Sequence, residues 1–394
     1  MTKKNNHFDI CIIGGLGHVG LPLGIYLSEK KLKVCCYDNN KLLLEKVEKG
    51  FMPYIEKNSE NLLKKNIKNG NLSFSIDPNS ISSSENIIIA IGTPVDEFLN
   101  PQINDFLQTI EKLKPYFKKD QLVIVRSSVF PKTCHKILKI LEDCPNLDLA
   151  YCPERIVQGF AFSELEKLPQ IIAGFSDAAK KRAGKLFKLI TKKIIYTSIG
   201  EAELMKLFSN SWRYIQFAVA NQFFMIANDY EEDFDRIRKI MMQDYDRASG
   251  LPSAGFAAGP CLLKDTMQLS SFYNNNFLLG QAAMNINEGL PNYIINDLKK
   301  NNKLVNKNIG IIGMSFKANI DDIRGSLSYK IKKSLIFEGA NVFCSDPFVK
   351  GKGFSTLENI LQKCDIIIIG APHDIYKDIK FDKHIVIDIW NINN

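Results

Sequence analysis

The sequence lacks any long apolar run. No stretch of its 394 residues approaches the ~18 consecutive apolar residues of a membrane span, so we expect no transmembrane helix. The apolar run after the short, polar positions 1–7 is broken by Gly14 and Gly15, which predicts a strand entering a turn and not a signal peptide. No basic stretch is dense enough, with aromatic residues interleaved, to favour nucleic acid as a partner.

The sequence also lacks the paired cysteines of a zinc site. None of the nine cysteines forms a Cys-x-x-Cys pair, so we expect no metal. An odd number of cysteines favours free thiols in a reducing cytoplasm. The net charge of +8 suits an anionic ligand such as a dinucleotide or a sugar nucleotide. Lysine and asparagine are abundant throughout the chain, however, and a biased composition explains the charge at least as well.

The chain is too long for one ordinary hydrophobic core, so we expect two or three domains. Its first ~195 residues alternate short apolar segments with helical ones, which predicts a mostly parallel sheet of an α/β fold. The alternation returns from Asn308, with a helix near 326–337. The segments predicted as strands are 9–13, 33–37, 86–91, 122–126, 149–152, 194–197, 309–312, 341–344, 366–369 and 385–389.

A long helix is predicted between the two α/β regions. No Gly or Pro occurs from Glu201 to Ser249, and Ser198 and Glu201 have the spacing of a capping box. A helix of roughly 28 residues would span ~42 Å, more than one domain needs. An apolar stripe at helical spacing predicts a tether between domains that packs against its copy in a homodimer. The stripe contains Leu204, Leu207, Phe208, Ile215, Val219, Phe223 and Ile226.

A glycine-rich turn follows the first predicted strand and precedes a helix. Gly15, Gly17 and Gly20 permit a tight turn, close approach to a pyrophosphate and close packing of helix on strand. The helix start then offers unpaired N–H groups to the anion. Asp38, at the end of the second strand, is placed to bind the ribose hydroxyls and to repel the additional phosphate of NADP. The pattern predicts NAD as the cofactor.

Two further strand ends are candidates for ligand contacts. Gly92-Thr93-Pro94 follows one predicted strand, and Arg126-Ser127-Ser128 ends the next. Both fall at the carboxyl edge of the predicted sheet, where ligands of open α/β folds bind. The ordinary preference of such residues for the loop that ends a strand explains both segments equally well.

Two places outside the first α/β region carry chemistry. Lys206 and Asn210 are four residues apart, so they share one face of the long helix and could bind a developing oxyanion; a solvated face is the alternative. Gly259-Pro260 predicts a turn, with a helix beginning near Cys261. The helix dipole and Lys264 would favour the thiolate of Cys261, and Asp265 could orient water or take a proton. A buried structural cysteine is the alternative.

Taken in order, these motifs resemble the UDP-glucose/GDP-mannose dehydrogenase family of nucleotide-sugar 6-dehydrogenases over nearly the whole chain. The matching residues are the glycine motif with Asp38, Gly92-Thr93-Pro94, Ser127-Ser128-Val129, Pro153-Glu154-Arg155, Lys206 with Asn210, Cys261 with Lys264-Asp265, and Phe316-Lys317 with Asp321-Asp322-Ile323-Arg324. The resemblance implies an α/β fold of two Rossmann-like parallel-sheet domains joined by a central helical region. We expect an NAD domain at 1–198, a central dimerisation and catalytic domain at 199–303, and a sugar-nucleotide domain at 304–394.

The resemblance also implies the reaction and the role of each residue. The family oxidises the sugar C6 alcohol to a carboxylate with two NAD, through a thiohemiacetal and a thioester on the residue that corresponds to Cys261. Lys206 and Asn210 would then stabilise oxyanions, and Glu154, Asp265 and Ser128 would hold the hydrolytic water. Contacts to NAD are implied for Thr93, Lys264 and Arg324. Contacts to the sugar nucleotide are implied for Glu154, Lys206, Asn210, Lys317 and, from a neighbouring subunit, Arg247.

Three departures from the family pattern affect the expected substrate. Ser128 stands where threonine is usual, Gln158 replaces a glutamate of many UDP-glucose enzymes, and 256–260 replaces a glycine-richer loop. Pro153-Glu154-Arg155 with Gly159 is more similar to members that act on UDP-N-acetylhexosamines. Two other hypotheses remain open: a two-electron β-hydroxyacid dehydrogenase, which needs no Cys261, and a non-catalytic sugar-nucleotide-binding protein.

Overall fold

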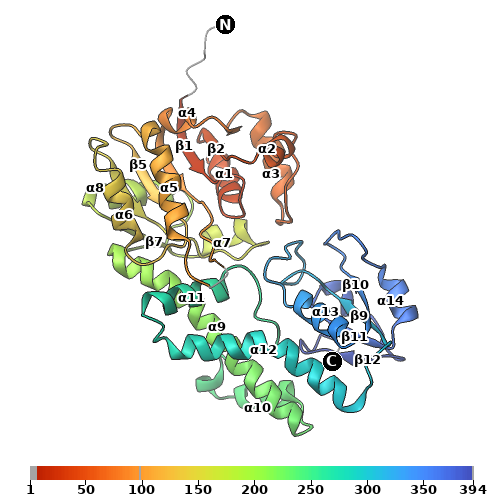
Figure 1. Cartoon of the computed structure of the whole chain (residues 1–394). Helices are drawn as coiled ribbons and strands as arrows, with labels where there is room; N and C mark the ends of the chain where they lie inside the picture. The colour runs from red at the N-terminus through yellow and green to blue at the C-terminus, as the bar shows by residue number, and fades with distance from the viewer. Residues whose placement is uncertain (1–6, 97–98, 393–394) are drawn as a thin grey trace. The chain divides into compact units, whose positions relative to one another are not determined.

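The computed structural model describes residues 7–96 and 99–392, and the chain divides into two compact units, 1–208 and 209–394 (Figure 1). Each unit is described by itself. Within the described residues, no helix is both long enough and apolar enough to cross a membrane.

The first unit is built on an eight-stranded sheet with the strand order β3-β2-β1-β4-β5-β6-β7-β8. All neighbouring pairs are parallel except β6 and β7, which are antiparallel. The first six strands have the order of a doubly wound dinucleotide-binding fold. The strands are β1 (Phe8–Ile13), β2 (Val34–Tyr37), β3 (Leu72–Ser75), β4 (Ser84–Ile89), β5 (Leu122–Val125), β6 (Asp148–Tyr151), β7 (Gln170–Gly174) and β8 (Ile194–Thr197).

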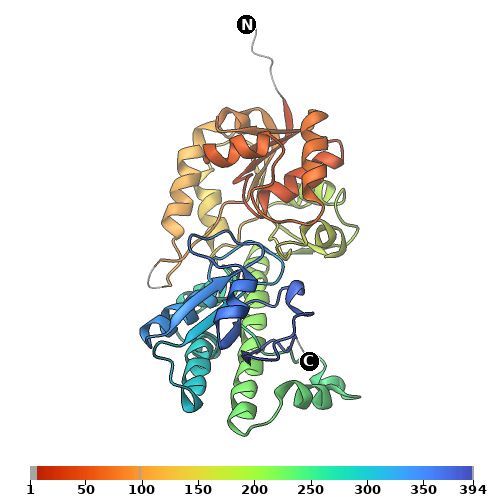
Figure 2. The same ribbon diagram turned by 90° about the vertical axis from the view of Figure 1, so that its right-hand side faces the viewer.

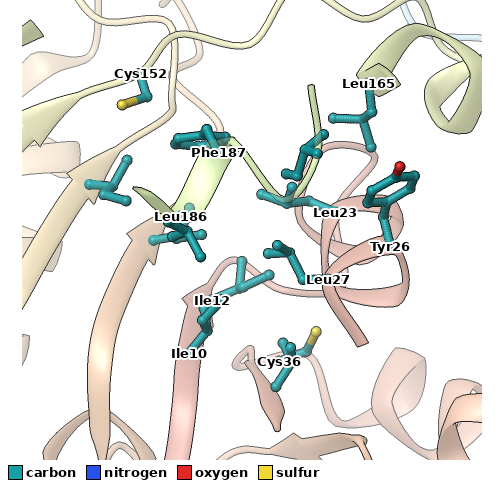
Figure 3. Packing of buried hydrophobic residues seen from close by; sticks show 14 of the residues in the cluster. Ile10, Ile12, Leu23, Tyr26, Leu27, Cys36, Cys152, Leu165, Leu186 and Phe187 are labelled. Atoms are coloured by element: carbon teal, nitrogen blue, oxygen red, sulfur yellow. The ribbon is translucent and has the colours of Figure 1, made fainter. Parts of the chain in front are cut away.

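Both faces of this sheet are buried, because successive side chains of a strand point to opposite faces and helices cover each. Ile10 and Ile12 of β1 pack in one apolar cluster with Leu23 and Leu27 (Figure 3), whereas Cys11 and Ile13 belong to the cluster on the other face. The helices of this unit are α1 (Gly20–Glu29), α2 (Lys41–Glu48), α3 (Ser59–Lys68), α4 (Asn79–Ser82), α5 (Ile103–Leu113), α6 (Thr133–Ile140), α7 (Ala161–Lys167) and α8 (Asp177–Phe187).

Helix α9 (Ile199–Asp229) has 31 residues, about 46 Å at 1.5 Å per residue, and it crosses the division between the units. Its start is the predicted capping box: Oγ of Ser198 accepts from the Glu201 N–H at 3.3 Å, and the Ser198 N–H donates to the Glu201 carboxylate at 2.9 Å. The buried face of α9 recurs at helical spacing, through Leu207, Asn210, Tyr214, Ala218 and Asn221.

The apolar stripe predicted on this helix is only partly buried. Leu207 is fully buried, but Phe208, Val219, Phe223 and Ile226 are exposed in the single chain, together with Trp212. The sequence pattern therefore located apolar positions on this helix. It did not distinguish those that the chain itself buries from those that the single chain leaves exposed.

The second unit contains a parallel four-stranded sheet with the order β10-β9-β11-β12, drawn in blue in Figure 2. Its core combines Ile309 and Ile311 of β9 with Leu290 and Ile294 of the long helix α12. The elements after α9 are α10 (Phe234–Met242), α11 (Leu262–Phe272), α12 (Leu278–Asn301), β9 (Asn308–Ile312), α13 (Ser328–Phe337), β10 (Asn341–Ser345), α14 (Leu357–Lys363), β11 (Ile366–Ile369) and β12 (Ile385–Ile387).

The same turn ends the first strand of each sheet. Gly14 follows β1 with a φ of +77° and Gly313 follows β9 with a φ of +89°, a conformation that other residues rarely adopt. A Cβ on Gly14 would lie 2.9 Å from the Ala90 carbonyl oxygen, and one on Gly313 would lie 2.5 Å from the Ala371 nitrogen. In both sheets, therefore, the first strand is followed by a glycine with a positive φ.

The predicted fold class, two Rossmann-like sheets joined by a helical region, is confirmed. Each segment predicted as a strand contains one, with ends that differ by a few residues. Two strands were not anticipated, β3 and β7, and the antiparallel direction of β7 was not anticipated either.

Candidate functional site

The glycine-rich turn has the geometry of a pyrophosphate-binding loop. The positive φ belongs to Gly14, one residue before the predicted motif, so Gly14 makes the tight turn. A Cβ on Gly15 would lie 2.6 Å from Cβ of Cys36, and one on Gly20 would lie 2.4 Å from the Gly14 carbonyl oxygen. At Gly17 the only neighbour within 4 Å would be that same oxygen, at 3.5 Å. The packing glycines are therefore 15 and 20, whereas a Cβ at Gly17 would make only an ordinary van der Waals contact.

Asp38 follows β2 and lies beside this loop. Its Oδ2 accepts a hydrogen bond of 3.2 Å from the Leu16 N–H, its Oδ1 accepts one of 3.1 Å from the Asn40 N–H, and the residue is only partly buried. These bonds orient the carboxylate and leave acceptor positions for hydroxyl groups. The glycine turn, the start of α1 and this carboxylate together fit a dinucleotide with a free ribose diol.

The two polar strand ends next to this loop contact each other. The Thr93 hydroxyl donates a hydrogen bond of 2.6 Å to the Ser128 carbonyl oxygen, and the Ser127 hydroxyl donates one of 2.6 Å to the Ile91 carbonyl oxygen. β4 and β5 are neighbouring parallel strands, so the loops after them leave the sheet at the same edge. Predicted contact residues Thr93 and Ser128 are therefore brought together.

Glu154 is held by a buried arginine of the same unit. Nη2 of Arg126 forms a very short ion pair with Oε2 of Glu154, and Nη1 of Arg126 donates to the carbonyl oxygen of Cys152 at 3.2 Å. Oε1 of Glu154 accepts from the N–H groups of Arg155 and Ile156 at 2.7 and 2.9 Å. The carboxylate is fixed in one orientation, because each oxygen has a defined donor. Arg126 was noted in the sequence only as part of a strand end, and no local pattern connects it with Glu154, which lies 28 residues further along the chain.

Cys261 differs from every other cysteine in the chain. It is exposed, and it occupies the N-cap of α11, where the helix dipole favours a thiolate. Cys144 is partly buried and the other seven cysteines are buried. Burial raises the pKa of Cys152 to about 12 and that of Cys364 to about 11, which keeps such thiols protonated and unreactive. The alternative of a buried structural cysteine therefore does not hold at position 261.

A buried polar group lies one turn along α11 from this thiol. Asp265 is fully buried; its Oδ1 pairs with Nζ of Lys264 at 2.5 Å, and its Oδ2 accepts from Nδ2 of Asn210 at 2.5 Å. Two donors, one of them charged, offset the cost of burying the carboxylate. Lys264 was expected to stabilise the Cys261 thiolate or to contact NAD, and the structure pairs it with Asp265. The backbone N–H of Asp265 also bonds to the Cys261 carbonyl oxygen at 2.9 Å.

Lys206 and Asn210 occupy the buried face of α9, one turn apart, with only 9% and 7% of their surface exposed. The solvated-face alternative therefore fails for both residues. Burial strengthens the interaction of a lysine and an amide with a negative oxygen, because the surroundings screen charge less than water does. The boundary between the two compact units falls between these residues, so Lys206 belongs to the first unit and Asn210 to the second.

The remaining predicted residues all belong to the second unit. Arg324 pairs with Asp322 through two nitrogens, with Nη2 at 2.6 Å from Oδ2. Lys317 is partly buried in the loop between β9 and α13. This loop packs against the turn before Cys261: a Cβ on Gly259 would lie 2.6 Å from the Phe316 ring. Arg247 is exposed in a short 3-10 turn, with its guanidinium 5.6 Å from the Tyr245 ring centre.

The predicted residues are thus divided between the two units. The first unit contains the glycine turn, Asp38, Thr93, Ser128, Glu154 and Lys206. The second contains Asn210, Arg247, Cys261, Lys264, Asp265, Lys317 and Arg324.

Three family models match consecutive parts of the chain. They describe the UDP-glucose/GDP-mannose dehydrogenase family: its NAD binding domain matches residues 8–193, its central domain 200–289 and its UDP binding domain 310–394.

Relatives with assigned activities cover almost the whole chain. A UDP-N-acetyl-D-mannosamine dehydrogenase of Methanocaldococcus jannaschii is 30% identical, over 97% of this chain and 88% of its own length. A UDP-glucose 6-dehydrogenase of Rickettsia bellii is 24% identical, over 96% of this chain and 94% of its own. Among solved structures, the UDP-D-ManNAc dehydrogenase from Pyrococcus horikoshii superposes with a TM-score of 0.90 at 27% identity, covering 98% of this chain and 96% of that one.

A dinucleotide-type glycine turn with an aspartate beside it, followed by a helical region with an exposed thiol and by a second nucleotide-type sheet, defines an NAD-dependent dehydrogenase of nucleotide sugars. The chain belongs to the UDP-glucose/GDP-mannose dehydrogenase family.

Proposed function

We propose that this dehydrogenase oxidises the C6 alcohol of a UDP-N-acetylhexosamine to the uronic acid in two steps, with Cys261 as the covalent nucleophile. The observation that carries the proposal is the exposed Cys261 thiol at the start of α11, next to the buried Asn210–Asp265–Lys264 group. The M. jannaschii relative and the P. horikoshii structure are both named for UDP-N-acetyl-D-mannosamine, which supports this substrate class.

NAD, when bound, accepts a hydride from the sugar carbon in each of the two oxidations. In the proposed sequence, the first oxidation gives an aldehyde, and the Cys261 sulfur adds to its carbonyl carbon to give a thiohemiacetal. The second oxidation turns this adduct into a thioester. Water then attacks the thioester carbon, which breaks the carbon–sulfur bond and releases the carboxylate and the thiol.

Each of the buried polar residues has a separate task in this sequence. Lys206 and Asn210 stabilise the negative oxygen at C6; one N–H of the Asn210 amide donates to Asp265, and the other is available for that oxygen. On the family pattern, we assign Asp265, Glu154 and Ser128 to the hydrolytic water. Arg126 keeps the Glu154 carboxylate in one position.

We assign the remaining contacts on the family pattern. Asp38, the glycine turn and Thr93 hold NAD, as do Lys264 and Arg324. Lys317 holds the sugar nucleotide, and Arg247 of a neighbouring subunit reaches the same substrate. The exposure of Arg247 supports a role at a subunit boundary. We propose the domains 1–198, 199–303 and 304–394, and the matches of the three family models to 8–193, 200–289 and 310–394 support these divisions.

We further propose a homodimer through α9. Phe208, Trp212, Val219, Phe223 and Ile226 lie on one side of the helix, and each is at least 40% exposed. An exposed apolar stripe of this length is typical of a protein interface. Nine free cysteines favour a reducing compartment, which supports the cytoplasm as the site of action.

The proposal is tested by counting NADH formed per molecule of sugar consumed, with a panel of UDP- and GDP-linked hexoses and N-acetylhexosamines. Two NADH per UDP-N-acetylhexosamine is the expected result. One NADH per substrate, with an aldehyde or ketone as the final product, would contradict the four-electron reaction.

A further inference from the structure

The loop between β9 and α13, residues 313–327, carries Lys317 and packs against the turn before Cys261. A loop in this position needs internal supports if it is to present one side chain to a ligand. The structure shows these supports in a network of hydrogen bonds centred on His373, a fully buried residue after β11 that has no part in the reaction sequence described above.

The bonds to His373 define which ring nitrogen carries the proton. The backbone N–H of Asn319 donates to Nδ1 of His373 at 2.8 Å, so Nδ1 must be the acceptor. Nε2 lies 3.1 Å from Oδ2 of Asp346 and 3.3 Å from the Ser315 hydroxyl, which has already donated its own proton to the Lys317 carbonyl oxygen at 2.7 Å. The neutral imidazole with its proton on Nε2 satisfies every bond. A proton on Nδ1 would instead face the N–H of Asn319.

Asp346 connects this histidine to the start of the loop. Its Oδ2 accepts from the N–H groups of Met314 and Ser315 at 2.6 and 2.9 Å, and its Oδ1 accepts from those of Phe348 and Val349 at 2.8 and 2.9 Å. Burial raises the pKa of this carboxyl, but the hydrogen bonds from His373 and from the N–H groups of Phe348 and Ser315 lower it below its ordinary value, so it stays ionised.

Comparison with the first unit shows that this arrangement serves the loop and not a ribose. Asp346 follows β10 in the same way that Asp38 follows β2. In the first sheet, Tyr37 precedes the aspartate and pairs with Ile13, the last residue before the glycine turn. In the second sheet, Ser345 precedes the aspartate and pairs with Ile312. Asp38 is partly exposed. The side chain of Asp346 is fully buried and uses its acceptor positions within the chain.

We propose that His373 is a positioning residue for the nucleotide-sugar site, which in its Nε2–H form holds Ser315 and Asn319 on either side of Lys317. The proposal rests on the proposed function, in which Lys317 binds the sugar nucleotide. Two supports flank the lysine: the Ser315 hydroxyl fixes its carbonyl group, and the backbone of Asn319 is fixed by the imidazole.

Two substitutions separate positioning from packing. H373L removes the three polar contacts of the ring, to Asn319, Asp346 and Ser315, at similar volume. We expect the KM for the nucleotide sugar to rise about tenfold, the effect of one or two lost buried hydrogen bonds. The KM for NAD should rise less than the KM for the nucleotide sugar, since Asp38 and the glycine turn belong to the other unit and only Arg324 shares the loop. H373Q offers one acceptor and one donor, and it should recover most of the lost affinity. H384Q is the matched control, because Nε2 of His384 contacts only the Leu361 carbonyl oxygen in the same sheet domain; it should leave both KM values unchanged.

A direct measurement of the tautomer does not depend on activity. The chain has five histidines, and nitrogen-15 NMR of the histidine-labelled protein should show one resonance pair typical of the Nε2–H form that H373Q removes. Should H373L fail to fold, S315A is the second variant: it deletes the bond to the Lys317 carbonyl oxygen and should also raise the KM for the nucleotide sugar.

Four results would overturn the positioning role: an unchanged nucleotide-sugar KM in H373L, an unchanged one in S315A, no recovery in H373Q, or an Nδ1–H tautomer. Wild-type protein that oxidises none of the nucleotide sugars would instead contradict the proposed function, whereas an active wild type with an unaffected H373L contradicts only the role of His373.

Discussion

The side-chain amide of Asn210 donates a 2.5 Å hydrogen bond to Oδ2 of Asp265, and this bond joins α9 to α11 inside the second unit. Asn210→Ala leaves the buried Asp265 with one donor fewer, which should lower the free energy of unfolding by about 2 kcal/mol. If Asn210 also binds the negative oxygen, kcat should fall about a hundredfold. Urea denaturation and steady-state kinetics measure the two effects. Asn228→Ala, which removes a 3.1 Å bond from the same helix to the partly exposed Asp297, is the control and should leave kcat unchanged.

Cys261→Ser should abolish steady-state turnover and leave NAD binding intact. A hydroxyl has a much higher pKa than a thiol and is a poorer leaving group at the acyl stage, so we expect a loss of at least ~1,000-fold. Mass spectrometry after one turnover would detect any ester that accumulates. The matched control is Cys144→Ser, at a partly buried free thiol of the first unit, which should keep full activity. Four-electron activity in Cys261→Ser would remove the covalent mechanism.

Asp38 should make the enzyme strongly prefer NAD to NADP, because its carboxylate and the 2′-phosphate of NADP would be like charges at short range. Asp38→Ser should raise kcat/KM for NADP relative to NAD about tenfold or more. The ratio of the two kcat/KM values, measured at one ionic strength, reports the preference. Equal values for both cofactors in the wild type would show that Asp38 lies away from the ribose.

Glu201 should stabilise the folded chain at neutral pH and lose this effect in acid. Hydrogen bonds from the Thr197 hydroxyl and from the backbone and hydroxyl of Ser198 lower its pKa to about 2 from an ordinary 4.5. Because the folded-state pKa is the lower one, the stabilisation is complete above pH 4.5 and disappears as the pH falls towards about 2. Glu201→Gln should therefore unfold at lower urea concentration than the wild type at pH 7, with a difference that shrinks through this window. Glu60→Gln, at an exposed glutamate in the first turn of α3, is the control. A difference independent of pH would assign the effect to packing.

Phe223→Asp should convert the proposed dimer into a monomer at micromolar concentration, as measured by light scattering, because it places a charge in the exposed apolar stripe of α9. Leu42→Asp alters an apolar side chain that is 81% exposed on α2 and should leave the assembly unchanged. A wild-type chain that is already monomeric would contradict the α9 interface.

The sequence predicted the architecture well because its signals are local. Runs such as Ile366–Ile369 are strands buried on both faces, and Ser198 with Glu201 shows where α9 begins. β3 was missed because Leu72–Ser75 has only four residues with no continuous apolar run. The direction of β7 was missed because it depends on how the chain returns to the sheet after α7, a long-range property that periodicity does not carry.

The site was predicted unevenly for the same reason. The spacing of Lys206 and Asn210 was enough to place both on one face of the helix. Their burial in the structure then excluded the alternative of a solvated face. The bond from Asn210 to Asp265 joins residues 55 positions apart, and the pair of Arg126 with Glu154 spans 28. Such partners come together only through the fold, so composition and local spacing could identify the site residues but not their hydrogen-bond and ion-pair partners.

The continuity of α9 also constrains how this protein can change during evolution. The helix turns through about 100° per residue, so one inserted residue between Lys206 and Asn210 would rotate everything that follows by more than a quarter of a circle. This rotation would move Asn210 away from Asp265 and turn Tyr214 and Asn221 out of the buried face. We therefore expect insertions and deletions to accumulate in the surface loops of this family, while α9 changes by substitution alone.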